Sequence, residues 1–263
     1  MEISKNKALL VRDSARTGID NMRIDDCLLQ RAVPEGPIVV RIYRWSEPTL
    51  SLGHFQQIED LVDDPAGISQ PSLNRLPWVR RKTGGGAILH DQEITYSFVI
   101  PASNGLLDKG ANEVLYRAVH EAVRDGLIRL GLEASLSENC TCSVAKKSGS
   151  VAKKSGSVAK KSGDEEPFLC FQRRTPVDLV VGAHKVLGSA QRRTRAGLLQ
   201  HGSLLLRASR EFGALLGIQD IGKIPPEFLW EEWLVDRLCE GLGTILPLNY
   251  EVLELKDFGY LLR

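Results

Sequence analysis

Residues Trp78–Ile100 read WVRRKTGGGAILHDQEITYSFVI and place two strand-like pieces on either side of a glycine-rich connection. The outer pieces, Trp78–Arg81 and Ile94–Ile100, contain β-branched and aromatic residues, which favour extended backbone. The three glycines Gly84–Gly86 cost conformational entropy unless the backbone needs a positive φ angle or a close approach to another group. The stretch therefore predicts two strands joined by a glycine loop whose backbone adopts a positive φ angle or lies close to another group.

The chain before this stretch is expected to add strands and one helix. Its apolar patterns predict a strand at Lys7–Val11, a helix at Thr17–Ala32 and a strand at Pro37–Trp45. Thr49–Gly53 alternates in polarity and is expected to be the hairpin partner of the strand before it. Residues 63–77 contain proline, glycine, asparagine and serine, and are expected to form a loop.

The chain after this stretch begins with the clearest helix and continues with strands. Ala111–Leu130 carries an apolar stripe at helical spacing, and its polar face, which includes His120, is expected to face solvent. Further strands are expected at Asp178–Val181, Lys185–Arg192 and Leu198–Leu206, and helices at Arg210–Leu216 and Pro226–Leu242. This order of elements predicts an α+β fold: a single domain over residues 1–263 with a mostly antiparallel sheet flanked by helices.

Composition and charge place the chain among ordinary globular proteins. Of its 263 residues 43% are hydrophobic and 25% are charged, and the formal net charge is +1. No apolar run approaches the roughly 20 residues of a membrane span, and the start of the chain does not resemble a secretory signal peptide. Five cysteines spread over the chain make no disulfide framework. We therefore expect a cytoplasmic protein that binds neither nucleic acid nor membranes.

Residues 143–163 consist of three identical copies of SVAKKSG and hold six lysines. Without this segment the chain has more acidic than basic residues, so its basic charge is concentrated here. Each copy places valine next to alanine and adds glycine and serine, which gives no coiled-coil seam. We expect a disordered insert; the alternative is a lysine-rich contact for an acidic partner.

The glycine loop is the first candidate site. Three cations, Arg80–Lys82, precede the glycines, and His90 follows them. Positive charge and exposed backbone N–H groups together suit a carboxylate, a thioester carbonyl or a phosphate. The loop is not a P-loop, because no Lys-Ser or Lys-Thr pair follows at the required spacing. A flexible hairpin with surface cations explains the same residues.

Cys170 is the second candidate. It lies among apolar residues in Phe168–Gln172, shortly after the repeat. A thiolate is a strong nucleophile but needs a nearby cation or hydrogen-bond donor. Lys185 follows fifteen residues later, a distance that allows an antiparallel return to the cysteine. A small buried cysteine in a core is the competing interpretation.

Two further patterns carry less information. His201-Gly202 inside an apolar strand indicates a close backbone approach, and a core histidine hydrogen-bonded to backbone is the simpler interpretation. Cys140-x-Cys142 has no second Cys or His pair at zinc spacing, so we expect no metal site.

Four stretches, in this order along the chain, resemble motifs of one superfamily. They are Asn21–Asp25 (NMRID), Arg44–Gly53 (RWSEPTLSLG), Arg80–Asp91 (RRKTGGGAILHD), and Asp178–Gln191 followed by Gln200–Leu205 (QHGSLL). The chain is similar to the lipoyl and octanoyl transfer superfamily, which contains lipoate–protein ligases, octanoyltransferases and, more distantly, biotin–protein ligases. The resemblance covers residues 7–207 and implies a fold like those of class II aminoacyl-tRNA synthetases and biotinyl ligases.

Within the superfamily the closest resemblance is to octanoyltransferases with a cysteine nucleophile upstream of a Lys-x-x-Gly-Ser-Ala segment. Cys170-Phe171 and Lys185–Ala190 match this arrangement. Gly86 departs from it, because these transferases tend to have arginine at the third position of the triplet, where ligases have glycine. The repeat has no counterpart in the family pattern.

The resemblance implies an acyltransferase with Cys170 and Lys185 as catalytic residues. An octanoyl thioester on acyl carrier protein would acylate Cys170. A lysine of a lipoyl domain, in the glycine cleavage H protein or a 2-oxoacid dehydrogenase E2, would then accept the acyl group, without a cofactor. The substrate-binding residues implied are Arg80, Arg81, Thr83, Gly84, Gly85, Gly86, His90, Gly188, Ser189, Ala190, His201 and Gly202.

Three alternatives remain open at this point. An ATP-dependent lipoate–protein ligase would use the glycine loop and Lys185 to hold lipoyl-AMP, with ATP and Mg²⁺, and Cys170 would take no part. An amidotransferase would move octanoyl between two lipoyl domains through the same cysteine. A non-catalytic module would bind an acyl chain or its carrier.

Overall fold

The structure is a computed structural model that describes residues 7–34, 36–61, 73–102, 111–139, 167–245 and 251–255. The repeat at 143–163, which we expect to be disordered, and Cys140-x-Cys142 lie outside the described residues. Among the helices within these ranges, none combines the length and the apolar character that crossing a membrane requires.

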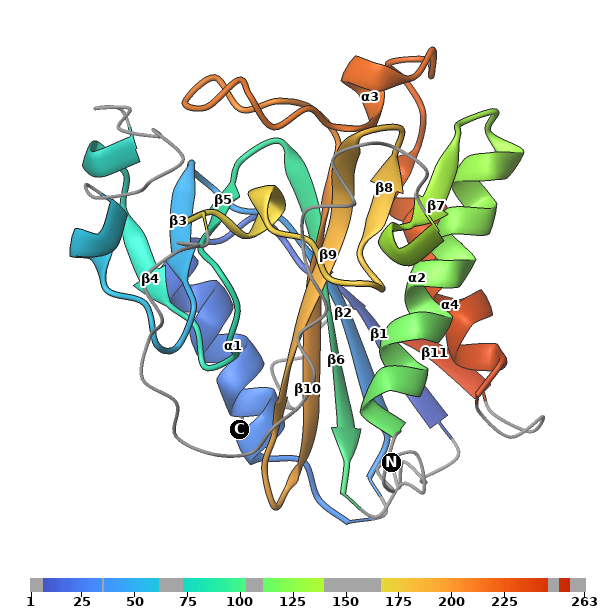
Figure 1. The fold of residues 1–263 in the computed structure, drawn as a ribbon. Coiled ribbons are helices and arrows are strands. Elements are labelled where there is room, and N and C mark those ends of the chain that lie inside the picture. The colour runs from blue at the N-terminus through green and yellow to red at the C-terminus, as the bar shows by residue number, and fades with distance from the viewer. Residues whose placement is uncertain are drawn as a thin grey trace.

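An eight-stranded sheet forms the centre of the molecule (Figure 1), in the strand order β11-β1-β2-β6-β10-β9-β8-β7. Its strands are β1 (Lys7–Arg12), β2 (Ile38–Tyr43), β6 (Glu93–Pro101), β7 (Ala134–Leu136), β8 (Leu179–Val181), β9 (His184–Arg193), β10 (Gly197–Leu205) and β11 (Glu251–Leu255). Strand β1 runs parallel to β2 and β11, and all other neighbours in this sheet are antiparallel. The expected mostly antiparallel sheet is therefore confirmed.

Helices cover both faces of this sheet. The α-helices of the described residues are α1 (Gly18–Gln30), α2 (Ala111–Arg129), α3 (Ile218–Ile221) and α4 (Trp230–Gly243). Helix α1 begins after Thr17, whose hydroxyl accepts a hydrogen bond from the backbone N–H of Asp20 (3.2 Å) and caps the helix. In Figure 1, α1 lies on one side of the sheet, and α2 and α4 pack together on the other.

Alternate strand residues contact different helices, because successive side chains of a strand point to opposite faces. Val40 and Phe98 belong to the large core cluster that includes residues of α2 and α4. Their neighbours Val39 and Val99 belong to a second cluster with α1. As a result, β6 and β10 are buried along their whole length.

A separate three-stranded sheet is built from β3 (Thr49–Leu52), β4 (Trp78–Arg80) and β5 (Ile88–His90), in the order β4-β3-β5. The predicted pairing of Thr49–Gly53 with the preceding strand is therefore wrong. Strand β3 pairs in parallel with β4 and antiparallel with β5. Its leucines pack in a small core with Phe168 and Leu169, far along the chain, which local alternation does not reveal.

The predictions near the C-terminus need two corrections. Residues 210–216 form no helix, because Phe212 and Leu215 pack into the small core with Phe168 and Leu169. Helix α4 begins at Trp230 and not at Pro226. The backbone N–H of Phe228 bonds to the carbonyl of Pro225 in a turn (3.1 Å), so the helix begins only after that turn.

Candidate active site

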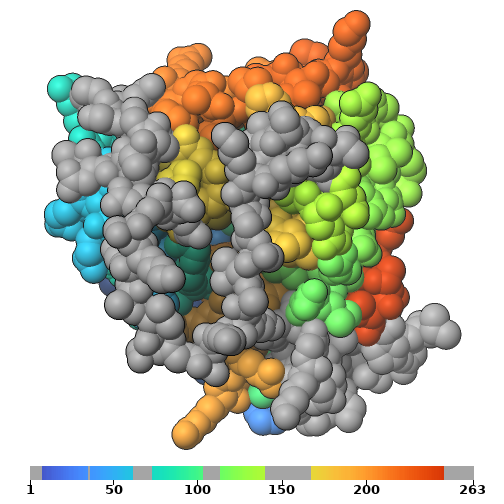
Figure 2. Space-filling view, in the orientation of Figure 1, coloured from blue at the N-terminus to red at the C-terminus, as the bar shows by residue number. Residues whose placement is uncertain are grey.

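Cys170 and Lys185 lie side by side, with Lys185 buried and Cys170 partly buried. Cys170 begins a short 3-10 turn, Cys170–Gln172, and Lys185 is the second residue of β9. The Lys185 Nζ lies 3.6 Å from the Cys170 Sγ and donates to the Cys170 carbonyl oxygen at 3.2 Å. In Figure 2 the segment that carries the cysteine is yellow and lies between the cyan residues on the left and the green residues of α2. The antiparallel return expected from the sequence therefore brings the two side chains together.

Asp178 completes this cluster. Its Oδ2 lies 2.8 Å from the Lys185 Nζ and also accepts the backbone N–H of Thr175 at 2.6 Å. Burial alone would lower the pKa of Lys185, but the negative charges of Cys170 and Asp178 outweigh it, and the pKa is raised. Lys185 is therefore an ammonium ion, held between a carboxylate and a sulfur. Asp178 is not among the site residues expected from the sequence, where its signal is an acidic residue directly before an apolar strand.

Gly188 leaves the space that the Lys185 side chain occupies. A Cβ atom at Gly188 would lie 2.6 Å from the Lys185 Cε and 3.0 Å from its Nζ. Both atoms are at the flexible end of the side chain, so a methyl group there would move the ammonium and leave the backbone in place.

We expect Gly188→Ala to separate the ammonium from Cys170 while the protein stays folded. A cysteine sulfur is more reactive with a cation beside it, and here the ammonium lies 3.6 Å away. Alkylation of Cys170 by iodoacetamide at pH 7, followed by peptide mass spectrometry, should therefore slow by about tenfold. Gly213→Ala is the control, because its Cβ would meet no described atom within 4 Å. Equal alkylation rates in both variants would contradict this role of Gly188.

The glycine loop packs against the backbone of the cysteine segment. Ala87 donates its N–H to the carbonyl of Phe168 (3.0 Å), and Cys170 donates its N–H to the carbonyl of Ala87 (2.7 Å). A Cβ at Gly86 would lie 3.0 Å from the Cys170 nitrogen. Gly85 has a φ of +92°, a conformation that side chains disfavour. The close approach and positive φ that we expected for the triplet are both present.

Arg81 points inward and not toward an open surface. Its side chain is buried, and its nitrogens donate to oxygens of Ser51, Thr83, Gly84 and Gly86. Burial lowers its pKa to about 10, against the opposing effect of negative charge on Cys170, so it stays a cation at neutral pH. Lys82 is exposed, and Arg80 is half-buried and donates to the backbone carbonyls of Gly53 and Gln56. In this conformation Arg81 fixes the loop, whereas we expected it to face a bound anion.

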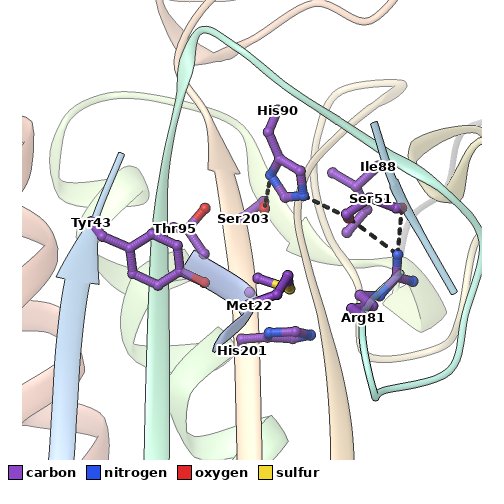
Figure 3. A pocket seen from close by; sticks show the side chains of 10 residues that line it. Met22, Tyr43, Ser51, Arg81, Ile88, His90, Thr95, His201 and Ser203 are labelled. Atoms are coloured by element: carbon purple, nitrogen blue, oxygen red, sulfur yellow. Dashed lines mark hydrogen bonds between the residues drawn. The ribbon is translucent and has the colours of Figure 1, made fainter. Parts of the chain in front are cut away.

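His90 and His201 are both buried beside Arg81 (Figure 3). The His90 Nε2 lies 2.7 Å from the Ser51 Oγ, and the ring stacks on Trp45 with centroids 3.8 Å apart. The His201 Nε2 lies 2.7 Å from the Thr83 Oγ1. A cavity of about 10 Å³ lies among these side chains. His201 is thus bonded to side chains, although we expected a backbone partner.

The Gly188–Ala190 segment and Gly202 build a polar cluster under the site. The Ser189 Oγ lies 2.8 Å from the His120 Nε2, and a Cβ at Gly202 would lie 2.3 Å from that oxygen. Ala190 is half-buried and pairs with His201 across β9 and β10. These contacts therefore tie β9, the strand that carries Lys185, to α2 and β10.

His120 is fully buried, so the prediction that it faces solvent is wrong. Its Nδ1 lies 2.7 Å from the carbonyl oxygen of Val177. The segment that covers it is remote in sequence, so the polar face of α2 gave no sign of burial.

Burial lowers the pKa of His120 to about 4, although the charge of Asp178 acts in the opposite direction. The unfolded chain binds a proton below about pH 6.5 and the folded protein does not, so stability is lost as pH falls from 6.5 toward 4. Urea unfolding should show a loss of about 2 kcal/mol from this group between pH 7 and pH 5. His120→Gln should lack that part of the loss. His54→Gln, at an exposed site, should keep it, and a full loss in both variants would refute the assignment.

Comparison with known proteins agrees with this architecture. Residues 18–222 match the model of the lipoyl protein ligase A/B catalytic domain. Octanoyltransferase LipM of Geobacillus kaustophilus (strain HTA426) is 34% identical over 192 residues, which make up 73% of this chain and 62% of that protein. Octanoyltransferase LipM of Macrococcus caseolyticus (strain JCSC5402) is 32% identical over 187 residues, 70% of this chain and 60% of that protein. The chain therefore spans about three fifths of the length of these curated relatives.

Solved structures show the same fold. Lipoate-protein ligase A bound with ATP superposes with a TM-score of 0.61 at 18% identity, over 98% of this chain and 93% of that chain. The likeness in structure covers both sheets, and the sequence match includes the four motifs singled out above from Asn21 to Leu205. The resemblance drawn from those motifs is confirmed, and the chain belongs to the lipoyl protein ligase A/B catalytic domain family.

Proposed function

We propose that this protein transfers an octanoyl group from a carrier-protein thioester to a lysine of a lipoyl domain, through an acyl-enzyme at Cys170. The observation that carries the proposal is the 3.6 Å contact between the Cys170 Sγ and the Lys185 ammonium, which Asp178 holds in place. The names of the curated relatives, octanoyltransferases, support the choice of acyl group.

The reaction consists of two acyl transfers. In the first, the Cys170 thiolate attacks the carbonyl carbon of the thioester, a new C–S bond forms, and the carrier's thiolate leaves and takes up a proton. In the second, the uncharged amine of the acceptor lysine attacks the acyl-enzyme. A C–N bond forms, the amine loses a proton, and the Cys170 thiolate is released. An amide is more stable than a thioester, so the two transfers together require no ATP, no metal and no other cofactor.

Lys185 has two functions in this scheme. Its ammonium stabilises the thiolate before attack, and it stabilises the negative oxygen that develops on the carbonyl during attack. Because Asp178 and the backbone already fix its position, it needs little rearrangement as charge develops.

Among the described residues, Gly84 of the glycine loop has open space where a side chain would project. A Cβ at Gly84 would meet no atom within 4 Å among the described residues, so packing alone does not require a glycine there. We assign this space to the substrate, with Gly84–Gly86 as one wall and His90 and His201 toward the inner end. The acyl carrier protein is the donor in this proposal, and the lipoyl domain of the H protein or of an E2 is the acceptor.

Intact-mass spectrometry with octanoyl-acyl carrier protein, in the absence of ATP and acceptor, tests the proposal. We expect an octanoyl adduct that maps to Cys170 and moves to an apo lipoyl domain when that domain is added. An adduct on another residue would refute the cysteine mechanism. Absence of any adduct, with modification of the acceptor by free acid and ATP, would show a ligase instead.

A further inference from the structure

Arg81 is a buried cation whose hydrogen-bonding capacity is filled by uncharged groups. A guanidinium has five N–H donors, and the structure gives it five acceptors. Three are backbone carbonyl oxygens, of Ser51 (2.7 Å), Gly84 (2.8 Å) and Gly86 (2.7 Å). The other two are the hydroxyl oxygens of Ser51 (3.3 Å) and Thr83 (3.2 Å). None of these five acceptors is a carboxylate, so the position of Arg81 depends on polar groups that must be correctly oriented.

The Ser51 hydroxyl is oriented by His90 and Glu93. The His90 Nδ1 lies 2.8 Å from the Glu93 Oε1, and a carboxylate only accepts, so Nδ1 carries the ring proton. Burial lowers the pKa of His90 and keeps the ring neutral, so its Nε2 accepts the Ser51 hydroxyl proton at 2.7 Å, and the Ser51 oxygen accepts from Arg81. We call Ser51, His90 and Glu93 the Ser51 relay.

The Thr83 hydroxyl is oriented in the same way. The His201 Nδ1 faces the Asp25 Oδ2 at 3.4 Å, and with the ring proton on Nδ1 the Nε2 accepts the Thr83 hydroxyl proton at 2.7 Å. The Thr83 oxygen accepts from the Arg81 Nε. We call Thr83, His201 and Asp25 the Thr83 relay. Two hydroxyl–imidazole–carboxylate relays thus converge on one guanidinium (Figure 3 shows the contacts of Ser51 with His90 and Arg81).

Arg81 connects both relays to the nucleophile. Its Nη2 holds the carbonyls of Gly84 and Gly86, and the next residue, Ala87, accepts the N–H of Cys170 at 2.7 Å. A shift of Arg81 would therefore move the backbone against which Cys170 lies. Misplacement of a reacting group by about 1 Å costs up to about a hundredfold in rate.

We propose that Ser51 and Thr83 are positioning residues for acyl transfer: their relays fix Arg81, and Arg81 fixes the glycine loop that supports Cys170. The inference rests on the proposed function for its main readout. A purely structural role would lower stability but leave the rate per folded molecule unchanged.

Ser51→Ala and Thr83→Val test the two relays. We expect each to lower the rate of acyl-enzyme formation at saturating octanoyl-acyl carrier protein about tenfold, with little change in KM. Thr83→Ser keeps the hydroxyl and should retain the rate. Thr49→Val is the matched control. This buried hydroxyl lies on β3, the strand of Ser51, but it donates to the Glu47 carbonyl (3.0 Å) and does not contact Arg81. Thr83→Val keeps the side-chain volume, so it still tests the contact if Ser51→Ala does not fold.

A double variant tests whether Ser51 acts through Arg81. In an Arg81→Gln background, Ser51→Ala should cause no further loss of rate, because the group that it positions is already gone. If the two losses multiply, Ser51 acts independently and the proposal is wrong.

Alkylation of Cys170 by iodoacetamide separates this inference from the proposed function. Ser51→Ala and Thr83→Val should slow alkylation, and Thr49→Val should not, whatever the natural acyl donor is. If wild-type protein forms no octanoyl adduct while alkylation is slowed in Ser51→Ala and Thr83→Val but not in Thr49→Val, only the proposed function fails. If both relay variants acylate and alkylate like wild type, or Thr49→Val slows equally, the inference fails.

Discussion

Octanoyl transfer is expected to stop when Cys170 is replaced by alanine. The sulfur is the only group in the cluster with Lys185 and Asp178 that can form the acyl-enzyme, and loss of a nucleophile costs at least about 10³-fold in rate. The intact mass of Cys170→Ala should show no octanoyl adduct after incubation with octanoyl-acyl carrier protein. Stability should change little, because the thiol is only partly buried.

Cys239→Ala is the control for this experiment. Cys239 is also a partly buried free cysteine, but it lies in α4, away from the glycine loop. This variant should form the adduct at the wild-type rate. Acceptor modification that persists in Cys170→Ala would show that the reaction does not pass through this cysteine.

Lys185→Met is expected to have the second-largest effect. Loss of a preorganised group that stabilises developing charge costs about 10²–10³-fold in rate. The substitution also leaves Asp178 buried without its cation, which costs about 3–5 kcal/mol of stability. Acyl-enzyme formation by intact mass and urea unfolding measure the two effects separately.

A double variant separates catalysis from folding. The double variant Lys185→Met with Asp178→Asn removes both charges of this ion pair, so no buried carboxylate is left without its cation. We therefore expect stability to recover in large part and the rate of acyl-enzyme formation to stay low. If the double variant acylates Cys170 at the wild-type rate, the ammonium is not needed and the 3.6 Å contact has no catalytic meaning.

The fold class could be predicted because its main elements carry local signals. The apolar stripe of α2 and the β-branched runs of β6 and β10 are visible in sequence, and their order excludes a doubly wound sheet. The partner of β3 could not be predicted, because its core depends on Phe168 and Leu169, more than a hundred residues away.

In the candidate site, too, features with a local sequence signal could be predicted and features that depend on distant residues could not. Cys170 and Lys185 could be paired because they lie within one antiparallel return. The inward direction of Arg81 and the burial of His120 could not, since each depends on acceptors from segments far away in the chain, such as Ser51 on β3 and Val177 in the turn before β8. A polar residue on a helix face or before a loop looks the same in sequence whether or not a distant segment covers it.

The two reactive side chains are held by different parts of the fold. The Cys170 segment is bridged to Ala87 beside the small sheet, whereas Lys185 lies on β9 of the large sheet. The thiol therefore acquires its cation only when the two sheets have docked. In a refolding experiment, the moment at which the rate of Cys170 alkylation by iodoacetamide changes from that of the unfolded chain to that of the native protein would date this docking step.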